Sequence, residues 1–291
     1  MNEVNKTLYI PLYGKALVNK RGIILEDAKA EEIWEKEQFP LKGKSASKWL
    51  AFYMAMRAWV FDTWVTEALK ENPDAMVLHI GCGMDSRILR VGTELTDTGE
   101  KRSNENSSDK NCSDENCSNE SSGPIWYDID FPEVIAERKK YYKETESYTM
   151  FGADASKTDW ITELPSDKKA IIIMEGISMY LPFTELVNLL DGLNQHFPEV
   201  KLLMDCYTVF AAKVSKYKNP IKEVGVSVTY GVDEPLKLAK EAGISFIKEH
   251  TMTPDEKVDE LQGFERKFFK NMMAGKVAEK LYRLYEFAGK K

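Results

Sequence analysis

The sequence predicts an α/β fold in which a mostly parallel sheet of seven strands carries helices on both faces, behind a helical N-terminal region. Three observations support this prediction. Short apolar runs alternate with amphipathic segments from residue 75 onward, a buried strand leads directly into a glycine turn at residues 81–83, and residues 46–71 have the periodicity of a long amphipathic helix. At 291 residues we expect a single domain, with residues 1–74 as a helical cap.

The individual elements follow from apolar runs bounded by Gly, Pro, Asp and Asn. Strands are expected at Ala75–Ile80, Ile125–Ile129, Ser147–Met150, Ala170–Glu175, Lys201–Asp205, Ile244–His250 and Leu281–Phe287. Helices are expected at Ala46–Glu71, Ser86–Val91, Pro132–Glu144, Phe183–His196, Glu234–Ala242 and Gly263–Ala274. The last strand and the one before it are joined by a helix-bearing connection. The alternation over Glu279–Phe287 also fits a terminal helix, and this alternative stays open.

Residues 92–123 interrupt this pattern with a segment rich in Ser, Asn, Asp and Glu that has almost no core-forming residue. Such a segment cannot offset its own ordering entropy, so we expect a disordered surface insert. It contains eight acidic and three basic residues, which account for five of the seven net negative charges of the chain. The rest of the chain is therefore nearly neutral, and it has no basic stripe of the kind that nucleic-acid binding requires.

The sequence also argues against a membrane protein, a secreted protein and a metal-binding protein. No run of about 18 apolar residues occurs, so we expect no membrane span. The N-terminus lacks a signal-peptide pattern and the four cysteines are scattered, which favours a cytoplasmic protein. Cys112 and Cys117 lack a second ligand pair, so we expect no metal site.

The glycine turn is the most informative motif. In Val77–Arg87 an apolar strand runs into Gly81-Cys82-Gly83, and glycine lets a ligand approach the backbone because it has no Cβ. This junction is typical of a nucleotide-type cofactor site in a doubly wound sheet. Ser86 stands where a dinucleotide fingerprint has its third glycine, which favours a cofactor without a pyrophosphate, such as S-adenosylmethionine.

Acidic residues follow the next strands, where ligands bind in open α/β sheets. Asp130 is placed to accept ribose hydroxyls, although it also fits a helix N-cap. Asp154, with the backbone of Ala155, could bind an adenine ring or could simply form a turn. Glu175 ends a wholly apolar strand and suits a cationic amino group.

A cofactor with a free carboxylate also needs a cation. Lys15 and Arg57 are the candidates in the N-terminal helical region, although an arginine on a helix is more often a surface residue.

Three motifs in this order resemble the leucine carboxyl methyltransferase family, which includes polyketide O-methyltransferases. They are Gly81-Cys82-Gly83-Met84-Asp85-Ser86-Arg87, Tyr127-Asp128-Ile129-Asp130-Phe131-Pro132 and Met174-Glu175-Gly176-Ile177-Ser178-Met179-Tyr180-Leu181. The resemblance extends from about Tyr13 to Tyr207. It implies a Rossmann-like class I methyltransferase that uses S-adenosylmethionine, with a helical cap over the pocket.

The resemblance also implies roles for single residues. Lys15 and Arg57 would clamp the cofactor carboxylate, and Gly81, Cys82 and Gly83 would approach its methionyl portion. Asp130 would bind the ribose, Asp154 and Ala155 the adenine, and Glu175 the amino group.

The methyl acceptor stays open at this stage. A carboxylate needs no general base, whereas a phenol would be helped by one. His79 and His196 are expected to be structural and His250 is a weak candidate, so no catalytic base is named. Tyr180, Tyr207 and Phe210 could line the acceptor pocket, although aromatic residues at such positions are more often core.

We expect a small-molecule acceptor more than a protein C-terminus, and no nucleic acid or membrane partner. The alternatives are an NAD-dependent oxidoreductase and a non-catalytic methyltransferase-like binding domain.

Overall fold

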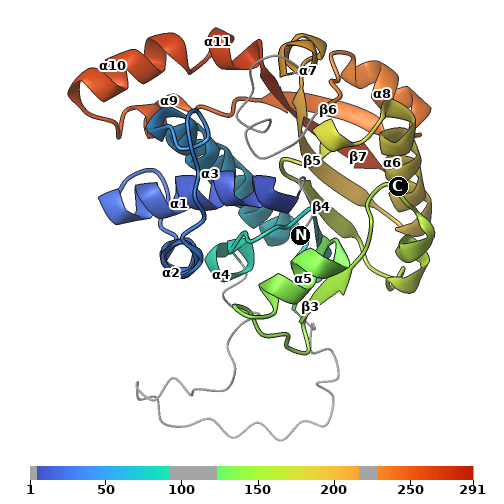
Figure 1. Ribbon diagram of the computed structural model, residues 1–291. Helices are drawn as coiled ribbons and strands as arrows, with labels where there is room; N and C mark the ends of the chain where they lie inside the picture. The colour runs from blue at the N-terminus through green and yellow to red at the C-terminus, as the bar shows by residue number, and fades with distance from the viewer. Residues whose placement is uncertain (1–4, 92–122, 216–227, 291) are drawn as a thin grey trace, which may run out of the picture.

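A seven-stranded sheet with the order β3-β2-β1-β4-β5-β7-β6 forms the centre of the protein (Figure 1). The computed structural model describes residues 5–91, 123–215 and 228–290. The strands are β1 (Met76–Ile80), β2 (Ile125–Asp130), β3 (Tyr148–Gly152), β4 (Ala170–Met174), β5 (Val200–Tyr207), β6 (Ser245–His250) and β7 (Tyr282–Gly289). The pairs among β1 to β5 are parallel, and β7 runs antiparallel to both β5 and β6. The predicted fold class is confirmed.

Helices cover both faces of this sheet, and three of them, α1 to α3, precede its first strand in the sequence. They are α1 (Tyr9–Arg21), α2 (Ala28–Glu37), α3 (Lys48–Glu71), α4 (Arg87–Val91), α5 (Pro132–Arg138), α6 (Phe183–His196), α7 (Val209–Ser215), α8 (Pro235–Glu241), α9 (Asp255–Val258), α10 (Gly263–Met272) and α11 (Lys276–Glu279). Short 3₁₀ turns occur at η1 (Asn5–Leu8), η3 (Asp159–Glu163) and η4 (Ser178–Tyr180).

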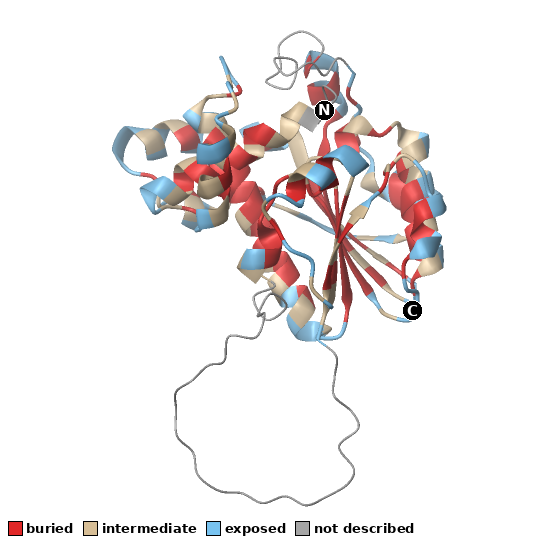
Figure 2. Cartoon of the chain, turned by 60° about the horizontal axis from the view of Figure 1, so that its bottom comes forward, coloured by how far each residue is buried: buried red, intermediate tan, exposed pale blue. Residues whose placement is uncertain are grey.

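The sheet separates two apolar cores, as Figure 2 shows by the buried strands at its centre. All five residues of β1 and of β4 are buried, as is typical of parallel strands covered on both faces. On one face Val77 and Ile171 pack into a core that includes α1 and α3. On the other face Leu78 and Ile172 pack into a core that includes α6 and α8. The alternation of side chains along each strand therefore serves both layers.

The predicted strands agree with the observed ones to within two residues at each end. Two expectations about elements are wrong. The helix expected over Pro132–Glu144 ends at Arg138, where the chain turns so that the Tyr142 hydroxyl donates to the Met84 carbonyl. The alternative of a terminal helix over Glu279–Phe287 fails because β7 pairs with both β5 and β6 along that stretch.

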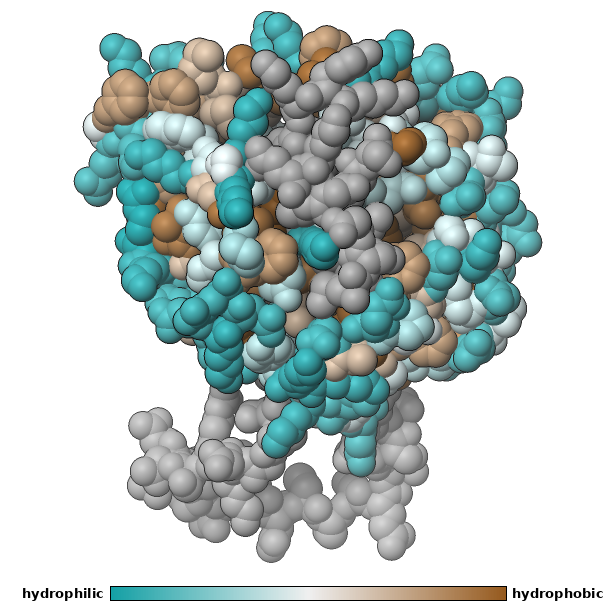
Figure 3. Space-filling view, in the orientation of Figure 1, coloured by the Kyte–Doolittle hydropathy of each residue, from teal (hydrophilic) through white to brown (hydrophobic). Residues whose placement is uncertain are grey.

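The acidic insert expected over residues 92–123 lies outside the described residues except for Gly123, and so do Cys112 and Cys117. In the space-filling view, polar side chains dominate the described surface, and apolar ones gather along the upper edge near α10 (Figure 3). Phe264 and Met272 of α10 are among the exposed apolar side chains. Across residues 5–91, 123–215 and 228–290, no helix combines the length and apolarity that crossing a membrane would need.

A buried ion pair joins β2 to α5 below the glycine turn. The Arg138 guanidinium donates to the Asp128 carboxylate and, through Nη1, to the Gly83 carbonyl at 3.1 Å. Asp128 also accepts from Trp126 Nε1 at 2.9 Å and from the Tyr148 hydroxyl at 2.6 Å. Neither ion has exposed side-chain surface, so each depends on the other for its solvation.

We expect Arg138→Met to destabilise the fold severely. The substitution keeps most of the side-chain volume but leaves the Asp128 charge buried without its cation, which costs about 3 to 5 kcal/mol of unfolding free energy. Urea denaturation followed by circular dichroism measures the change.

The matched control is Arg266→Met, which removes an exposed arginine from a 2.7 Å ion pair with Asp259. The unfolding free energy of this variant should fall by less than about 1 kcal/mol. Equal losses in the two variants would show that burial of the Arg138 pair does not matter.

Candidate functional site

A cavity of about 420 Å³ lies at the carboxyl ends of the central parallel strands, where η1, α1 and α3 cover the edge of the sheet. This volume is within the range of small-molecule sites. The cavity is lined by eleven of the twelve residues predicted for cofactor and acceptor binding: Lys15, Arg57, Gly81, Cys82, Gly83, Asp130, Asp154, Ala155, Glu175, Tyr180 and Tyr207. The twelfth, Phe210, is 59% exposed on α7 and does not line this cavity.

The glycine turn brings bare backbone to the cavity wall. Gly81 and Gly83 have φ angles of 74° and 51°, a region that L side chains rarely adopt. The amides of Gly81 and Cys82 donate to the Ile129 carbonyl at 2.7 and 3.2 Å, which ties the turn to the end of β2. A Cβ at Gly81 would lie 2.8 Å from Ile177 Cδ1. Both the backbone angle and the close neighbour therefore require glycine at this position.

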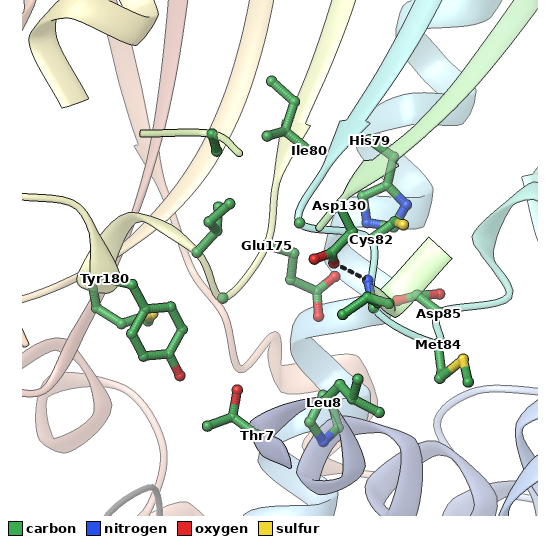
Figure 4. Close-up of a pocket in the computed structure, with 18 of the residues that line it drawn as sticks. Thr7, Leu8, His79, Ile80, Cys82, Met84, Asp85, Asp130, Glu175 and Tyr180 are labelled. Atoms are coloured by element: carbon green, nitrogen blue, oxygen red, sulfur yellow. Dashed lines mark hydrogen bonds between the residues drawn. The ribbon is translucent and has the colours of Figure 1, made fainter. Parts of the chain in front are cut away.

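Asp130 closes the same turn from the end of β2 (Figure 4). Its carboxylate accepts from the Gly83 amide at 2.8 Å and from the Phe131 amide at 2.8 Å. Burial raises the pKa of Asp130 to about 6 in spite of these hydrogen bonds. The carboxylate is thus ionised at neutral pH and faces the cavity.

Glu175 is held by two arginines from different helices. Arg57 Nε of α3 donates to Oε1 at 3.0 Å, and Arg87 Nη2 of α4 donates to Oε2. Arg57 Nη1 also donates to Asp205 at 2.7 Å. Although burial alone would raise the pKa of the Glu175 carboxyl, the two guanidinium groups hold it below its ordinary value. The carboxylate stays charged at the cavity wall.

Lys15 has a buried acidic partner as well. Its Nζ lies 2.7 Å from Asp85 Oδ2, and Asp85 also contacts Arg90 at 3.0 Å. Lys15 and Arg57 thus form the positive part of the lining, as the predicted carboxylate clamp would need.

Asp154 is also part of a turn, because its side chain accepts from the Ser156 amide at 2.9 Å. It lines the cavity beside Ala155, so the two interpretations of this residue are compatible.

Sequence reasoning missed three charged residues of this site: Asp85, Arg87 and Asp205. Asp85 and Arg87 stand inside the glycine motif, where their charge beside a buried strand was the available signal. Asp205 lies two residues before the end of β5, and its carboxylate accepts a hydrogen bond from the Gly176 amide at 2.6 Å. Its place near the end of an apolar strand is the same signal that identified Glu175.

The chain is similar to several known methyltransferases. Residues 3–98 match the model of the leucine carboxyl methyltransferase family. The chain is 27% identical over 252 residues to the tetracenomycin polyketide synthesis O-methyltransferase TcmP of Streptomyces glaucescens, a match that covers 86% of this chain and 83% of the relative. It is 25% identical to the S-adenosyl-L-methionine-dependent methyltransferase dpfgK of Gibberella zeae, over 67% of this chain and 61% of the relative.

The chain is an S-adenosylmethionine-dependent methyltransferase. The predicted resemblance to the leucine carboxyl methyltransferase family is confirmed, and the comparisons give no support to the oxidoreductase alternative. Among solved structures, magnesium protoporphyrin IX methyltransferase of Synechocystis PCC 6803 with bound S-adenosylhomocysteine aligns with a TM-score of 0.48 and 12% identity, over 94% of this chain and 97% of that one.

The lining of the methyltransferase cavity also includes aromatic side chains. Tyr207 at the end of β5 and Tyr282 at the start of β7 are paired in register, with their hydroxyls 3.2 Å apart. Tyr180 of η4 also belongs to the lining, and in Figure 4 it lies across the cavity from Glu175. Burial raises the pKa of Tyr180 and of Tyr282, so their hydroxyls stay neutral donors at physiological pH. Tyr282 was not predicted because it lies on the last strand, far from the motifs.

The histidines occupy other positions. His79 of β1 is buried, with Nε2 3.1 Å from Arg87 and Nδ1 3.3 Å from Asp128, and burial lowers its pKa. His250 of β6 lies 2.6 Å from Glu286 and outside the cavity lining. His196 ends α6 with Nε2 2.9 Å from the Leu164 carbonyl. His79 is therefore the one histidine that reaches the lining among the described residues.

We expect Gly81→Ala to destabilise the protein by more than the cost of an unfavourable backbone angle. A non-glycine residue in the left-handed region costs about 1 to 2 kcal/mol, and the added Cβ also collides with Ile177. Thermal and urea unfolding measure the loss.

Gly22→Ala is the matched control, since Gly22 has a φ of 62° but no atom within 4 Å of an added Cβ. It should show the backbone cost alone. A loss in Gly81→Ala no larger than that in Gly22→Ala would contradict the close approach.

Proposed function

We propose that this S-adenosylmethionine-dependent O-methyltransferase methylates an acidic oxygen, a carboxylate or a readily ionised hydroxyl, of a small aromatic molecule. The observation that supports the proposal is that one cavity is lined both by charged side chains and by the three tyrosines Tyr180, Tyr207 and Tyr282. A small molecule is favoured over a protein C-terminus because the relative TcmP acts in the synthesis of a polyketide.

The charged side chains of the lining suit the methyl donor. Lys15 and Arg57 would bind the methionyl carboxylate, and Glu175 would bind the ammonium group. Asp130 would accept the ribose hydroxyls, with Asp154 and the Ala155 backbone at the adenine. These assignments agree with the charges of the donor, since its carboxylate and its ammonium group would each meet an opposite charge from the lining.

Bare backbone supports the same arrangement. Gly81, Cys82 and Gly83 would let the donor approach the turn between β1 and α4, because glycine adds no Cβ to the cavity wall at Gly81 and Gly83. The donor would therefore lie across the carboxyl edge of β1, β2 and β4, as ligands do in open α/β sheets.

The tyrosine side chains of the lining suit the acceptor. An aromatic ring packs well against Tyr180, Tyr207 and Tyr282, and the neutral hydroxyl of Tyr180 can donate to an anionic oxygen. The acceptor oxygen attacks the sulfonium methyl carbon in line, so that the O–C bond forms as the S–C bond breaks and its electron pair returns to sulfur. The protein contributes alignment at near-attack distance.

The acceptor is proposed to be ionised before it reacts. His79, the histidine of the lining, is already engaged by Arg87 and Asp128 and is not available as a general base. A carboxylate or an acidic phenol needs no base at neutral pH.

We also propose a cytoplasmic location and no nucleic-acid partner. The free, buried thiols of Cys82 and Cys206 and the near-neutral charge outside residues 92–123 support these assignments.

Donor affinity is expected to fall as the pH drops through about 6. Above that pH Asp130 is ionised and can accept the ribose hydroxyls, whereas protonation removes acceptor capacity at the ribose. Calorimetric titration with S-adenosylhomocysteine from pH 5 to pH 8 measures this effect. Asp130→Asn should bind more weakly at pH 8 and lose the inflection; an inflection that survives the substitution would assign it to another group.

Methyl transfer is expected to follow the ionised fraction of the acceptor. With donor labelled in the methyl group, aromatic carboxylic acids should yield methyl esters at rates nearly independent of pH between about 7 and 9, because carboxyl groups are fully ionised there. The corresponding carboxamides are the matched controls and should be inert. Labelling of peptides at their C-terminal carboxyl, with no labelling of small aromatic acids or phenols, would contradict the proposed substrate class.

A further inference from the structure

Arg87 contacts Glu175, which lines the cavity proposed for the methyl donor. Arg87 is the first residue of α4, has no exposed surface and does not line the cavity. Its guanidinium contacts Asp62 of α3 at 2.6 Å, Nε2 of His79 at 3.1 Å, and Glu175 at the end of β4. Arg87 Nη2 also lies 3.6 Å from Asp85 Oδ2. Glu175 and Asp85 are the charged partners that line the cavity, and Glu175 is the closer of the two to Arg87.

The geometry around Glu175 leaves its carboxylate no freedom to rotate. Arg87, on α4, donates a hydrogen bond to one carboxylate oxygen of Glu175. Arg57, on α3, donates to the other oxygen at 3.0 Å. Rotation of the carboxylate would break a buried, charge-assisted hydrogen bond on at least one side. The two helices together determine how Glu175 faces the cavity.

Arg87 is itself fixed by the glycine turn. Its backbone amide donates to Asp85 Oδ1 at 2.9 Å, and its side chain lies over the Phe61 ring at 5.4 Å from the centroid. Asp62 also has Arg90 as a second cationic partner, so removing Arg87 does not leave Asp62 alone. Arg90 contacts both carboxylate oxygens of Asp62, whereas Arg57 contacts only Oε1 of Glu175, so Oε2 of Glu175 loses its cationic partner when Arg87 is removed.

We propose that Arg87 is a positioning residue that holds Glu175 oriented and ionised for the ammonium group of the methyl donor. This inference rests on the proposed donor orientation, in which Glu175 meets that ammonium group. Arg87 would act through the carboxylate alone, without contact to the donor.

The charges around Glu175 define a pH signature. Arg57 of α3 and Arg87 of α4 contact it, Lys15 of α1 and Asp85 of the glycine turn act on it from nearby, and Asp205 of β5 shares Arg57 with it. With both arginines present the pKa of Glu175 lies below its ordinary value, so the carboxylate stays charged throughout the neutral range. Without Arg87, burial and Asp85 raise that pKa, and Glu175 begins to protonate as the pH falls.

The test compares two ligands that differ only in the amino group: S-adenosylhomocysteine and its deaminated analogue, which keeps the carboxylate, ribose and adenine. The ratio of their dissociation constants isolates the ammonium contact, and the titration of Asp130 affects both ligands equally. Calorimetry between about pH 5.5 and 7.5 keeps the ammonium charged.

In Arg87→Gln, the preference for S-adenosylhomocysteine should fall by about tenfold and should fall further as the pH decreases. In the unchanged protein the preference should be flat with pH. Arg87→Lys, which keeps the charge but loses the planar fork, should give an intermediate preference.

Arg90→Gln is the matched control, because Arg90 is buried beside Arg87 and contacts Asp62 and Asp85 but not Glu175. It should lower the melting temperature and leave the preference unchanged. Glu175→Gln should abolish the preference at every pH.

The outcomes distinguish the positioning role of Arg87 from the proposed orientation of the donor. If Glu175→Gln abolishes the preference while Arg87→Gln keeps the preference and the pH profile of the unchanged protein, the role of Arg87 is refuted and the donor orientation stands. If Glu175→Gln keeps the preference, the donor orientation itself is refuted. Should Arg87→Gln fail to fold, a preference in Arg87→Lys equal to that of the unchanged protein would overturn the inference.

Discussion

The ion pairs that converge on Glu175 join the N-terminal helices to the carboxyl edge of the sheet. Arg57 comes from α3, Arg87 from α4, and the carboxylate from the end of β4. All three side chains are almost completely buried. Since an unpaired buried ion costs several kcal/mol, any packing of the cap that separates these elements is strongly disfavoured. The placement of the cap over the sheet thus depends on charge as well as on apolar contacts.

The same ion pairs stand at the wall of a cavity whose lining combines two kinds of side chain. Glu175 and Arg57 are held in place by their charged partners. Tyrosine hydroxyls and apolar side chains complete the lining, and Tyr207 and Tyr282 meet across β5 and β7. In the proposed function, a charged methyl donor and an aromatic acceptor would meet in this one cavity, as direct transfer requires.

Much of the fold and many of the residues that line the cavity could be predicted because both depend on local patterns. Apolar runs bounded by Gly, Pro and Asp located all seven strands. Asp130 and Glu175 could be placed in one site because parallel strands end at the same edge of a sheet. The helix expected to reach Glu144 was wrong because a tertiary contact, between the Tyr142 hydroxyl and the Met84 carbonyl, stabilises the turn that follows Arg138.

By itself, the sequence determined the α/β class, the glycine turn at residues 81–83 and the chemical types of side chain at the strand ends. These properties follow from backbone conformation and from periodicity, which act over a few residues. Only the tertiary structure decided that Arg87 supports Glu175, that Asp205 shares Arg57, and that Tyr282 faces Tyr207. Each of those pairs joins residues at least 75 positions apart. Such contacts arise from the packing of whole helices against the sheet, which local sequence patterns do not encode.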